Sequence, residues 1–178
     1  MNLWHDISIG KNAPEEINCI VEIPKGSQNK YELDKESGLI KLDRANYGPT
    51  PYPVEYGFIP QTLAEDGDAM DVLLFSSFPI HPGILVEIRP VALMKMTDTG
   101  EPDDKIIAVP TEDRRWEDIK DLTDLNKHTL KEIKLFFETL KNLKGKPAVN
   151  TVHGYESKAL AIEAIKHSQK LYAEKFGK

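Results

Sequence analysis

The chain lacks several features on which large classes of protein depend. It has a single cysteine, Cys19, so an internal disulfide is excluded, which fits a reducing compartment. Cys19 lies in a mostly apolar run, residues 17–21, and is interpreted as a buried structural thiol. No stretch approaches the roughly 18 apolar residues of a membrane-spanning helix, and the first twenty residues contain no signal core. These absences predict a soluble, cytoplasmic protein with no membrane partner.

Basic charge and recognisable cofactor motifs are also missing. The net charge is -6, whereas a protein that binds nucleic acid through its phosphates needs a basic face. The five histidines are dispersed, which opposes a histidine-rich transition-metal site. There is no glycine-rich nucleotide loop, no zinc-type cysteine spacing and no serine nucleophile elbow. A length of 178 residues suffices for one core, so a single domain spanning residues 1–178 is expected.

What remains is a pattern of short strands followed by helices. Runs of apolar and β-branched residues predict strands at residues 17–23, 30–33, 39–42, 72–75, 84–88, 91–96 and 106–109. Residues 48–60 contain four prolines, which predicts an ordered loop or an irregular extended stretch. The fold class is therefore α+β and mainly β: a curled, largely antiparallel sheet or small barrel that carries two packed helices.

The two helices come from a change of period in the last third. Residues 126–143 place one apolar stripe along a helix: Leu130, Ile133, Phe136, Phe137, Leu140 and Leu143. Glycine and proline break the chain at residues 145–147. A second helix over residues 157–176 is expected to bury Ala161, Ala164, Ile165, Leu171 and Tyr172.

Residues 65–71 hold Glu65, Asp66, Asp68 and Asp71 with no basic residue among them. Two ionised carboxylates about 4 Å apart repel by about 4 kcal/mol at an effective dielectric constant near 20. Such a group needs a cation, a shared proton or full exposure to water. Asp-Gly-Asp is also ordinary turn chemistry, so a solvated turn is an open alternative. The predicted strand that follows at residues 72–75 favours a rigidly held metal site.

Other charged residues lie at the ends of predicted strands. Residues 98–105 form a second acidic segment, which alone is typical of a solvated hairpin tip; if it converged with the first, the two would suit two or more Mg²⁺ ions. Lys30, Arg44 and Lys105 are each interpretable as surface cations or as groups for a polyanionic ligand. Glu22 interrupts an apolar strand, which favours a functional role.

The residues also match a known family. The segment from Asp66 to Val72 resembles the D-x-D-x-x-D signature of soluble family I inorganic pyrophosphatases of the bacterial type. Further colinear matches occur at residues 20–24, 30–38, 43–44, 52–60, 95–98 and 103–110. The resemblance covers roughly residues 13 to 145.

The resemblance implies a five-stranded OB-type barrel with two C-terminal helices packed outside it, usually assembled as a homohexamer. It implies magnesium-dependent hydrolysis of inorganic pyrophosphate to two orthophosphates by a metal-activated hydroxide, with several Mg²⁺ ions per site and Mn²⁺ or Zn²⁺ as substitutes. Asp68 would be the general base. The implied metal ligands are Asp66, Asp71, Asp103, Asp98 and Glu22, and the implied substrate-binding residues are Lys30, Arg44, Tyr56, Lys105 and Lys141.

Three positions depart from the family pattern. Ala69 replaces a proline, Thr99 replaces an acidic residue, and Leu140 replaces the tyrosine of a Tyr-Lys pair that binds phosphate, which weakens the transfer of that role to Lys141. Three alternatives stay open: a related phosphohydrolase of nucleoside triphosphate or polyphosphate, a non-catalytic OB-type binding module, and a metal-binding structural or interaction protein that has lost activity. The last should have altered Asp68 or Lys30, and both are present.

Overall fold

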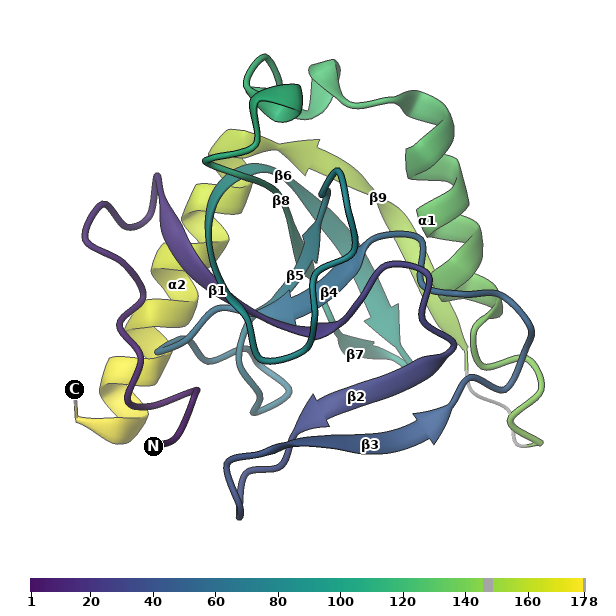
Figure 1. Ribbon diagram of the computed structural model, residues 1–178, viewed down its shortest axis with the longest axis horizontal. Helices are drawn as coiled ribbons and strands as arrows, with labels where there is room; N and C mark the ends of the chain where they lie inside the picture. The colour runs from purple at the N-terminus through teal and green to yellow at the C-terminus, as the bar shows by residue number, and fades with distance from the viewer. Residues whose placement is uncertain (146–148, 178) are drawn as a thin grey trace.

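The computed structural model describes residues 1–145 and 149–177, and its centre is a closed ring of β-strands (Figure 1). The ring strands, in the order in which they pair, are β1 (Ile17–Ile23), β4 (Glu55–Phe58), β5 (Asp71–Leu74), β8 (Lys105–Pro110) and β6 (Leu85–Asp98). The β5–β8 pair is parallel and the others are antiparallel, and β6 pairs back with β1. The ring confirms the five-stranded OB-type barrel.

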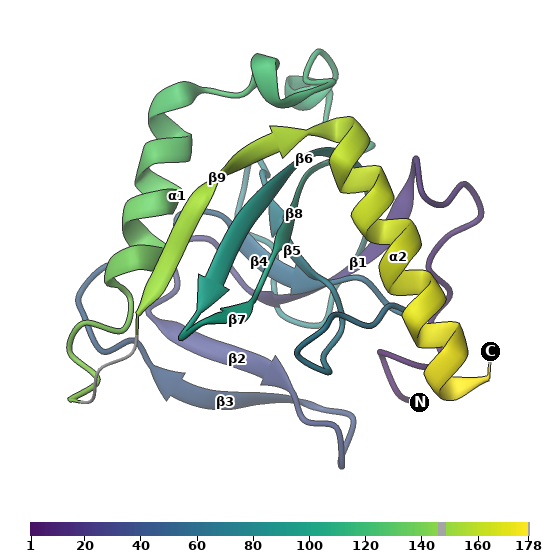
Figure 2. The same ribbon diagram turned by 180° about the vertical axis from the view of Figure 1, so that it is seen from behind.

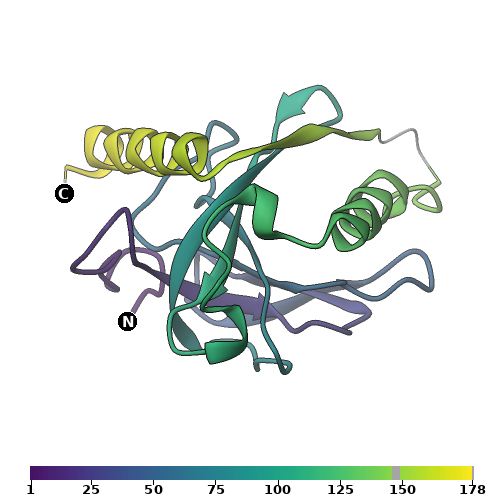
Figure 3. The same ribbon diagram turned by 90° about the horizontal axis from the view of Figure 1, so that it is seen from above.

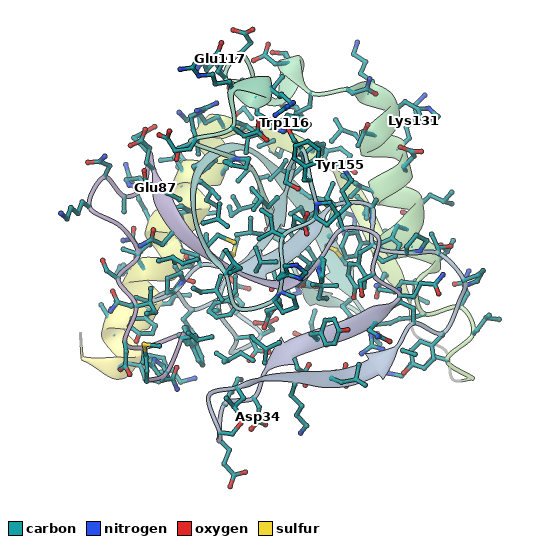
Figure 4. The ribbon with its side chains drawn as sticks, viewed as in Figure 1. Asp34, Glu87, Trp116, Glu117, Lys131 and Tyr155 are labelled. Atoms are coloured by element: carbon teal, nitrogen blue, oxygen red, sulfur yellow. The ribbon has the colours of Figure 1, made fainter. Side chains whose placement is uncertain are left out.

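Within the described residues, four more strands extend or flank the ring. β7 (Glu101–Pro102) and β9 (Asn150–Ser157) pair with the long strand β6. β2 (Asn29–Leu33) and β3 (Ile40–Ala45) form a separate antiparallel hairpin, which lies below the ring in Figures 1 and 2. Asp34, at the turn of this hairpin, is at the opposite edge of the molecule from Trp116, which lies in the short 3₁₀ turn Arg114–Trp116 (Figure 4). A second 3₁₀ turn covers Leu122–Asp124.

Two α-helices lie at opposite sides of the barrel within the described residues (Figures 2 and 3). α1 (Lys127–Thr139) packs on β9, and the Asn126 side chain caps its first turn. α2 (Lys158–Phe176) packs on β6. Both predicted helices are confirmed. Neither is long and apolar enough to cross a membrane.

The helices bury most of the side chains expected, with one clear error. In α2, Ala161, Ile165 and Tyr172 are buried, while Ala164 and Leu171 are partly buried. Leu143 was expected on the buried stripe of α1, but it is 69% exposed because the helix ends at Thr139. Of the predicted chain break, Gly145 is described and residues 146–148 lie outside the described residues.

The central strands contribute apolar side chains to two separate layers. In β5, Leu73 joins the layer that includes α1, whereas Val72 joins the layer that includes α2. Ile107 and Ile106 of β8 alternate in the same way. Because both faces are covered, all residues of β8 are buried, as is usual for a strand with a parallel partner.

Four of the described strands differ most from the prediction, and one of them is the two-residue β7, which lies in the segment expected to be a hairpin tip. β4 forms inside the segment predicted to be irregular, because Pro53 and Pro60 flank residues 55–58 rather than interrupt them. β6 is one continuous strand instead of two, and Pro90 is tolerated because the β6–β8 register shifts between Pro90 and Ala92. β9 was not predicted; its sequence has polar residues and Gly154, and it gains its partner only by packing on β6.

Gly57 allows β4 to approach β1 closely. A Cβ atom at this position would lie 2.1 Å from the carbonyl oxygen of Ile20, which is far inside van der Waals contact. The neighbouring residue, Tyr56, faces the cavity described below. The close approach therefore helps to place a side chain of that cavity.

We predict that Gly57→Ala lowers the free energy of unfolding by about 3 kcal/mol, because strand β4 must move away from β1. Gly48→Ala is the matched control, since a Cβ atom there has no neighbour within 4 Å among the described residues. Urea denaturation of both variants measures the difference. Equal stabilities would show that the β1–β4 contact is not tight.

Candidate active site

A cavity of about 950 Å³, here called the basin, lies between the β2–β3 hairpin and the ends of the barrel strands. Every site residue expected from the sequence lines it: Glu22, Lys30, Arg44, Tyr56, Asp66, Asp68, Asp71, Asp98, Asp103, Lys105 and Lys141. They come from the hairpin, from five barrel strands or the loops beside them, and from the segment after α1. The fold therefore brings both predicted acidic segments and the predicted cations to one opening.

Lys105 is at the centre of the basin floor and is only 2% exposed. Its ammonium Nζ donates to Asp71 Oδ2 and to Asp103 Oδ1, both at 2.7 Å, and to the Tyr56 hydroxyl at 3.0 Å. The Tyr56 hydroxyl in turn donates to Asp71. The parallel register places Asp71 directly opposite Lys105, so the pairing of β5 with β8 builds this cluster.

The charges of this cluster alter one another's proton affinity. Burial alone would lower the pKa of the Lys105 ammonium, but Asp71 and Asp103 outweigh burial and raise it. Burial raises the pKa of Asp103 to about 6; Lys105 opposes this rise and Asp71 adds to it. Burial, Asp71 and Asp103 together raise the pKa of Tyr56, so its hydroxyl keeps its proton. Lys105 thus stabilises two neighbouring carboxylates that would otherwise repel each other.

The first acidic segment is held in place by Thr62. Its hydroxyl donates to the carbonyl of Ile59 at 2.6 Å and accepts from the backbone N–H of Met70 at 3.0 Å. Within the loop, the Asp68 N–H donates to Asp66 Oδ1 at 3.0 Å. Burial raises the pKa of Asp66, helped by the charges of Asp71 and Asp68. The loop is therefore ordered, which favours a binding site over a solvated turn.

Asp68 faces across the basin towards the hairpin. Lys35, in the β2–β3 turn, forms an ion pair with Asp68, and its ammonium lies 5.4 Å from the centre of the Trp4 ring. Both side chains of the pair are well exposed, so the contact can open without a large loss of buried contacts. Asp68 is thus accessible from the basin.

Glu22 is a buried carboxyl group on the wall of the basin. It is 8% exposed, and its Oε1 accepts the backbone N–H of Leu33 at 2.7 Å. Burial raises its pKa to about 8, and the charge of Asp71 adds to this rise. Glu22 therefore differs from a surface glutamate: its carboxyl group is buried and holds its proton to a higher pH.

The hairpin provides a cationic wall. Lys30 and Arg44 are directly opposite in the β2–β3 register, so their side chains project from the same face. Lys30 Nζ lies 2.8 Å from Glu32 and 3.1 Å from Asp43, and Arg44 also pairs with Asp43. Arg44 Nε is buried and has no hydrogen-bond partner in the described residues. This wall therefore contains a guanidinium donor without a partner among the described residues.

Lys141 and Asp98 form an ion pair on the other side of the basin. Burial opposes ionisation of Asp98, but Lys141 and the Thr99 hydroxyl outweigh it and lower its pKa. Leu140 lines the basin beside Lys141 and can donate no hydrogen bond there. The position at which the resemblance implies a tyrosine is thus apolar.

The acidic residues fit a hard divalent cation by donor chemistry. All the candidate ligands are carboxylates, whose oxygens suit Mg²⁺ and similar ions. Across the described residues no three acidic side chains are already gathered around one point; the lysines stand between them instead. This arrangement follows from charge, since clustered carboxylates repel unless a cation separates them.

Several basin residues were missed in the sequence. Glu32 lies two residues from Lys30 on β2, and this spacing could have identified it as a partner on the same face. Tyr52 lines the basin, with its ring centre 6.0 Å from that of Tyr56, and burial raises its pKa to about 12. Lys35 and Asn150 also line it, but only tertiary packing brings them there.

Comparisons with known proteins agree over nearly the whole chain. A family model described as inorganic pyrophosphatase matches residues 19–173. An inorganic pyrophosphatase from Haloferax volcanii is 50% identical over 176 residues, 99% of this chain and 99% of that protein. A soluble inorganic pyrophosphatase from Oryza sativa subsp. japonica is 49% identical over 170 residues, 95% of this chain and 78% of that protein. The crystal structure of inorganic pyrophosphatase from Thermus thermophilus has a TM-score of 0.94 and 42% identity, covering 97% of this chain and 99% of that chain.

The raised pKa values predict how stability depends on pH in protein treated with a chelator. The folded state binds protons on Glu22 and Asp103 more tightly than the unfolded state, whose carboxyls titrate near 4. The folded state therefore loses stability as pH rises from about 5 to 8. We expect a falling melting temperature over this range, measured by circular dichroism.

Glu22→Gln should make the decline shallower, because the amide does not titrate. The control is Glu163→Gln, at an exposed position of α2, which should retain the wild-type slope. If Glu22→Gln and wild type showed the same decline, the carboxyl of Glu22 would not be the group that titrates.

Proposed function

The chain belongs to the inorganic pyrophosphatase family, and from this membership we propose how the residues of the basin share the work of hydrolysis. The protein is a hydrolase that converts inorganic pyrophosphate to two orthophosphates, and it uses divalent metal ions. Its solved structural neighbours include the bacterial enzyme from Thermus thermophilus. The observation that carries the proposal is that all the expected site residues, from distant segments, line one basin.

The cationic wall is proposed to bind the two phosphoryl groups. Pyrophosphate offers oxygen acceptors almost exclusively, so it needs ammonium and guanidinium donors. The Nε atom of Arg44 is buried and has no partner among the described residues. Lys30 forms ion pairs with Glu32 and Asp43, and a phosphate group can replace these carboxylates. Tyr56 and Lys105 form the floor and Lys141 the opposite wall. Because Leu140 cannot donate, this wall has one phosphate contact fewer than a Tyr-Lys pair would give.

The proposed metal ligands are the carboxylates around Lys105 and at the rim. Asp66, Asp71 and Asp103 would hold the central cations, and Asp98 and Glu22 would hold cations that accompany the substrate. We propose several Mg²⁺ ions, with Mn²⁺ or Zn²⁺ as substitutes, because magnesium prefers carboxylate and phosphate oxygens. When bound, such ions neutralise phosphate charge and lower the pKa of coordinated water.

Asp68 is proposed as the general base. It is accessible from the basin, beside Asp66 and across from the cationic wall. Its carboxylate would accept the proton of the attacking water, while Lys30 and Arg44 hold the phosphoryl groups in line and stabilise the leaving phosphate. The Lys35 ammonium, which pairs with Asp68 here, would then be free to turn towards the substrate.

We also propose a cytoplasmic homohexamer built from one domain, residues 1–178. In support, the family model spans most of the chain. The exposed apolar side chains Phe78, Ile84 and Leu85 lie close together in sequence and offer a surface for self-association. We favour pyrophosphate hydrolysis over the triphosphatase and binding-module alternatives. The similar proteins are named inorganic pyrophosphatases, and their alignments cover 99% and 95% of this chain.

We expect Asp68→Asn to lower kcat for phosphate release from pyrophosphate at least 100-fold, because the amide cannot take up the proton of the attacking water. The assay is run with Mg²⁺ and with chelator, and chelator should abolish turnover of the wild type. Glu65→Gln, at an exposed neighbouring position, is the matched control and should keep wild-type kcat. Unchanged turnover in Asp68→Asn would refute the base, and a magnesium-independent wild type would refute the metal assignment.

We expect Asp71→Ala to weaken Mg²⁺ binding more than Asp98→Ala does. Asp71 lies at the centre of the basin between Tyr56 and Lys105, whereas Asp98 lies at the rim with one-third of its side chain exposed. Isothermal titration calorimetry of the two variants without substrate measures the order. The reverse order would contradict the ranking of central and rim ligands.

A further inference from the structure

One buried amide on the wall of the basin has no part in the mechanism above. Asn150, the first residue of β9, is 7% exposed and lines the basin. In the β6–β9 register it is directly opposite Asp98. Directly opposite residues of an antiparallel pair project from the same face with their Cβ atoms about 5 Å apart. The amide of Asn150 therefore stands beside the carboxylate of Asp98.

The nitrogen end of this amide is already committed. Nδ2 donates to the carbonyl oxygen of Phe137 at 3.1 Å, in the last turn of α1, where carbonyls lack a partner within the helix. This bond determines the orientation of the amide, because the reversed amide would place Oδ1 against another carbonyl oxygen. The oxygen of Asn150 is therefore the free end.

That oxygen is buried and accepts no hydrogen bond from any described residue. A buried carbonyl oxygen without a donor is uncommon in proteins and unfavourable. Two ammonium groups that line the basin are engaged with carboxylates: Lys141 pairs with Asp98, and Lys105 pairs with Asp71 and Asp103. Since the described residues supply no donor, we look for the donor to Asn150 in what enters the basin.

The chemistry of the basin limits what this donor is. Pyrophosphate and orthophosphate present mainly acceptor oxygens, so they do not match an acceptor. Waters on a divalent cation are polarised donors, and Mg²⁺ keeps several of them when it binds to protein. We infer that Asn150 Oδ1 accepts a hydrogen bond from a water coordinated to the cation held at Asp98. This inference rests on the proposed function, which assigns a cation to Asp98.

Asn150 is thus an outer-sphere residue: it contacts a water of the cation at Asp98 and not the cation itself. Such residues orient the inner ligands, and their loss commonly weakens metal binding tenfold or more. Through Nδ2 the same amide holds the end of α1, close to Leu140 and Lys141. One side chain therefore links the cation at Asp98 to the segment that carries a phosphate-binding lysine.

Two variants separate this role from a purely structural one. Asn150→Leu removes both hydrogen-bonding ends, whereas Asn150→Asp keeps an acceptor oxygen and loses the donor to Phe137. Both should lower the melting temperature, because both lose the bond to α1. Binding of Mn²⁺ to protein saturated with inorganic phosphate, measured from the electron paramagnetic resonance of free Mn²⁺, should differ. We expect about tenfold weaker binding of one class of Mn²⁺ in Asn150→Leu, and wild-type or tighter binding in Asn150→Asp.

Two further variants complete the experiment. Asp98→Ala identifies the class of Mn²⁺ that is held at the rim, and Thr151→Val, the next residue of β9, projects from the other face and should bind as wild type. If Asp98→Ala removes no class, the cation assigned to Asp98 is wrong, and the inference falls with it. If Asp98→Ala removes a class of bound Mn²⁺, and Asn150→Leu binds that class with wild-type affinity, only the role of Asn150 is refuted. Tenfold weaker binding in Asn150→Asp also refutes it, even if Asn150→Leu fails to fold.

Discussion

The Lys105 ammonium lies between the carboxylates of Asp71 and Asp103, with the Tyr56 hydroxyl as its third partner. A buried charge that loses its partner is strongly destabilising, so these groups depend on one another. They meet only if β5 and β8 pair in parallel with Asp71 opposite Lys105. The cluster therefore couples the topology of the barrel to the electrostatics of its basin, and the other charged side chains are arranged around it.

Local sequence patterns predicted the parts of the fold that local physics determines. Residues 17–23 form a strand with the predicted bounds, and both helices begin within a residue or so of expectation. The strands β4 and β9 could not be found this way, because prolines surround β4, polar residues and Gly154 interrupt the strand pattern of β9, and each strand depends on a distant partner. The continuity of β6 through Pro90 likewise depends on a register shift against β8.

Single residues of the sequence predicted the chemistry of the site less well than local patterns predicted the fold. A lone lysine or an Asp-Gly-Asp turn has the same appearance on a solvated surface as in a binding site, so the resemblance to a family carried the assignment. Spacing could have revealed Glu32 beside Lys30, but it could not reveal the pairing of Lys35 with Asp68 or the free oxygen of Asn150. Both of these features arise from packing between segments that are far apart in the chain.

Strand β6 has pairing partners along its length: β1, β8, β7 and β9. β9 begins about fifty residues after β6 ends, next to α2. During synthesis on a ribosome, one edge of β6 stays uncovered until β9 has emerged, and an uncovered strand edge invites pairing with another chain. The side of the basin that carries Asn150 and the protection of β6 against misassembly are thus completed together, when β9 emerges.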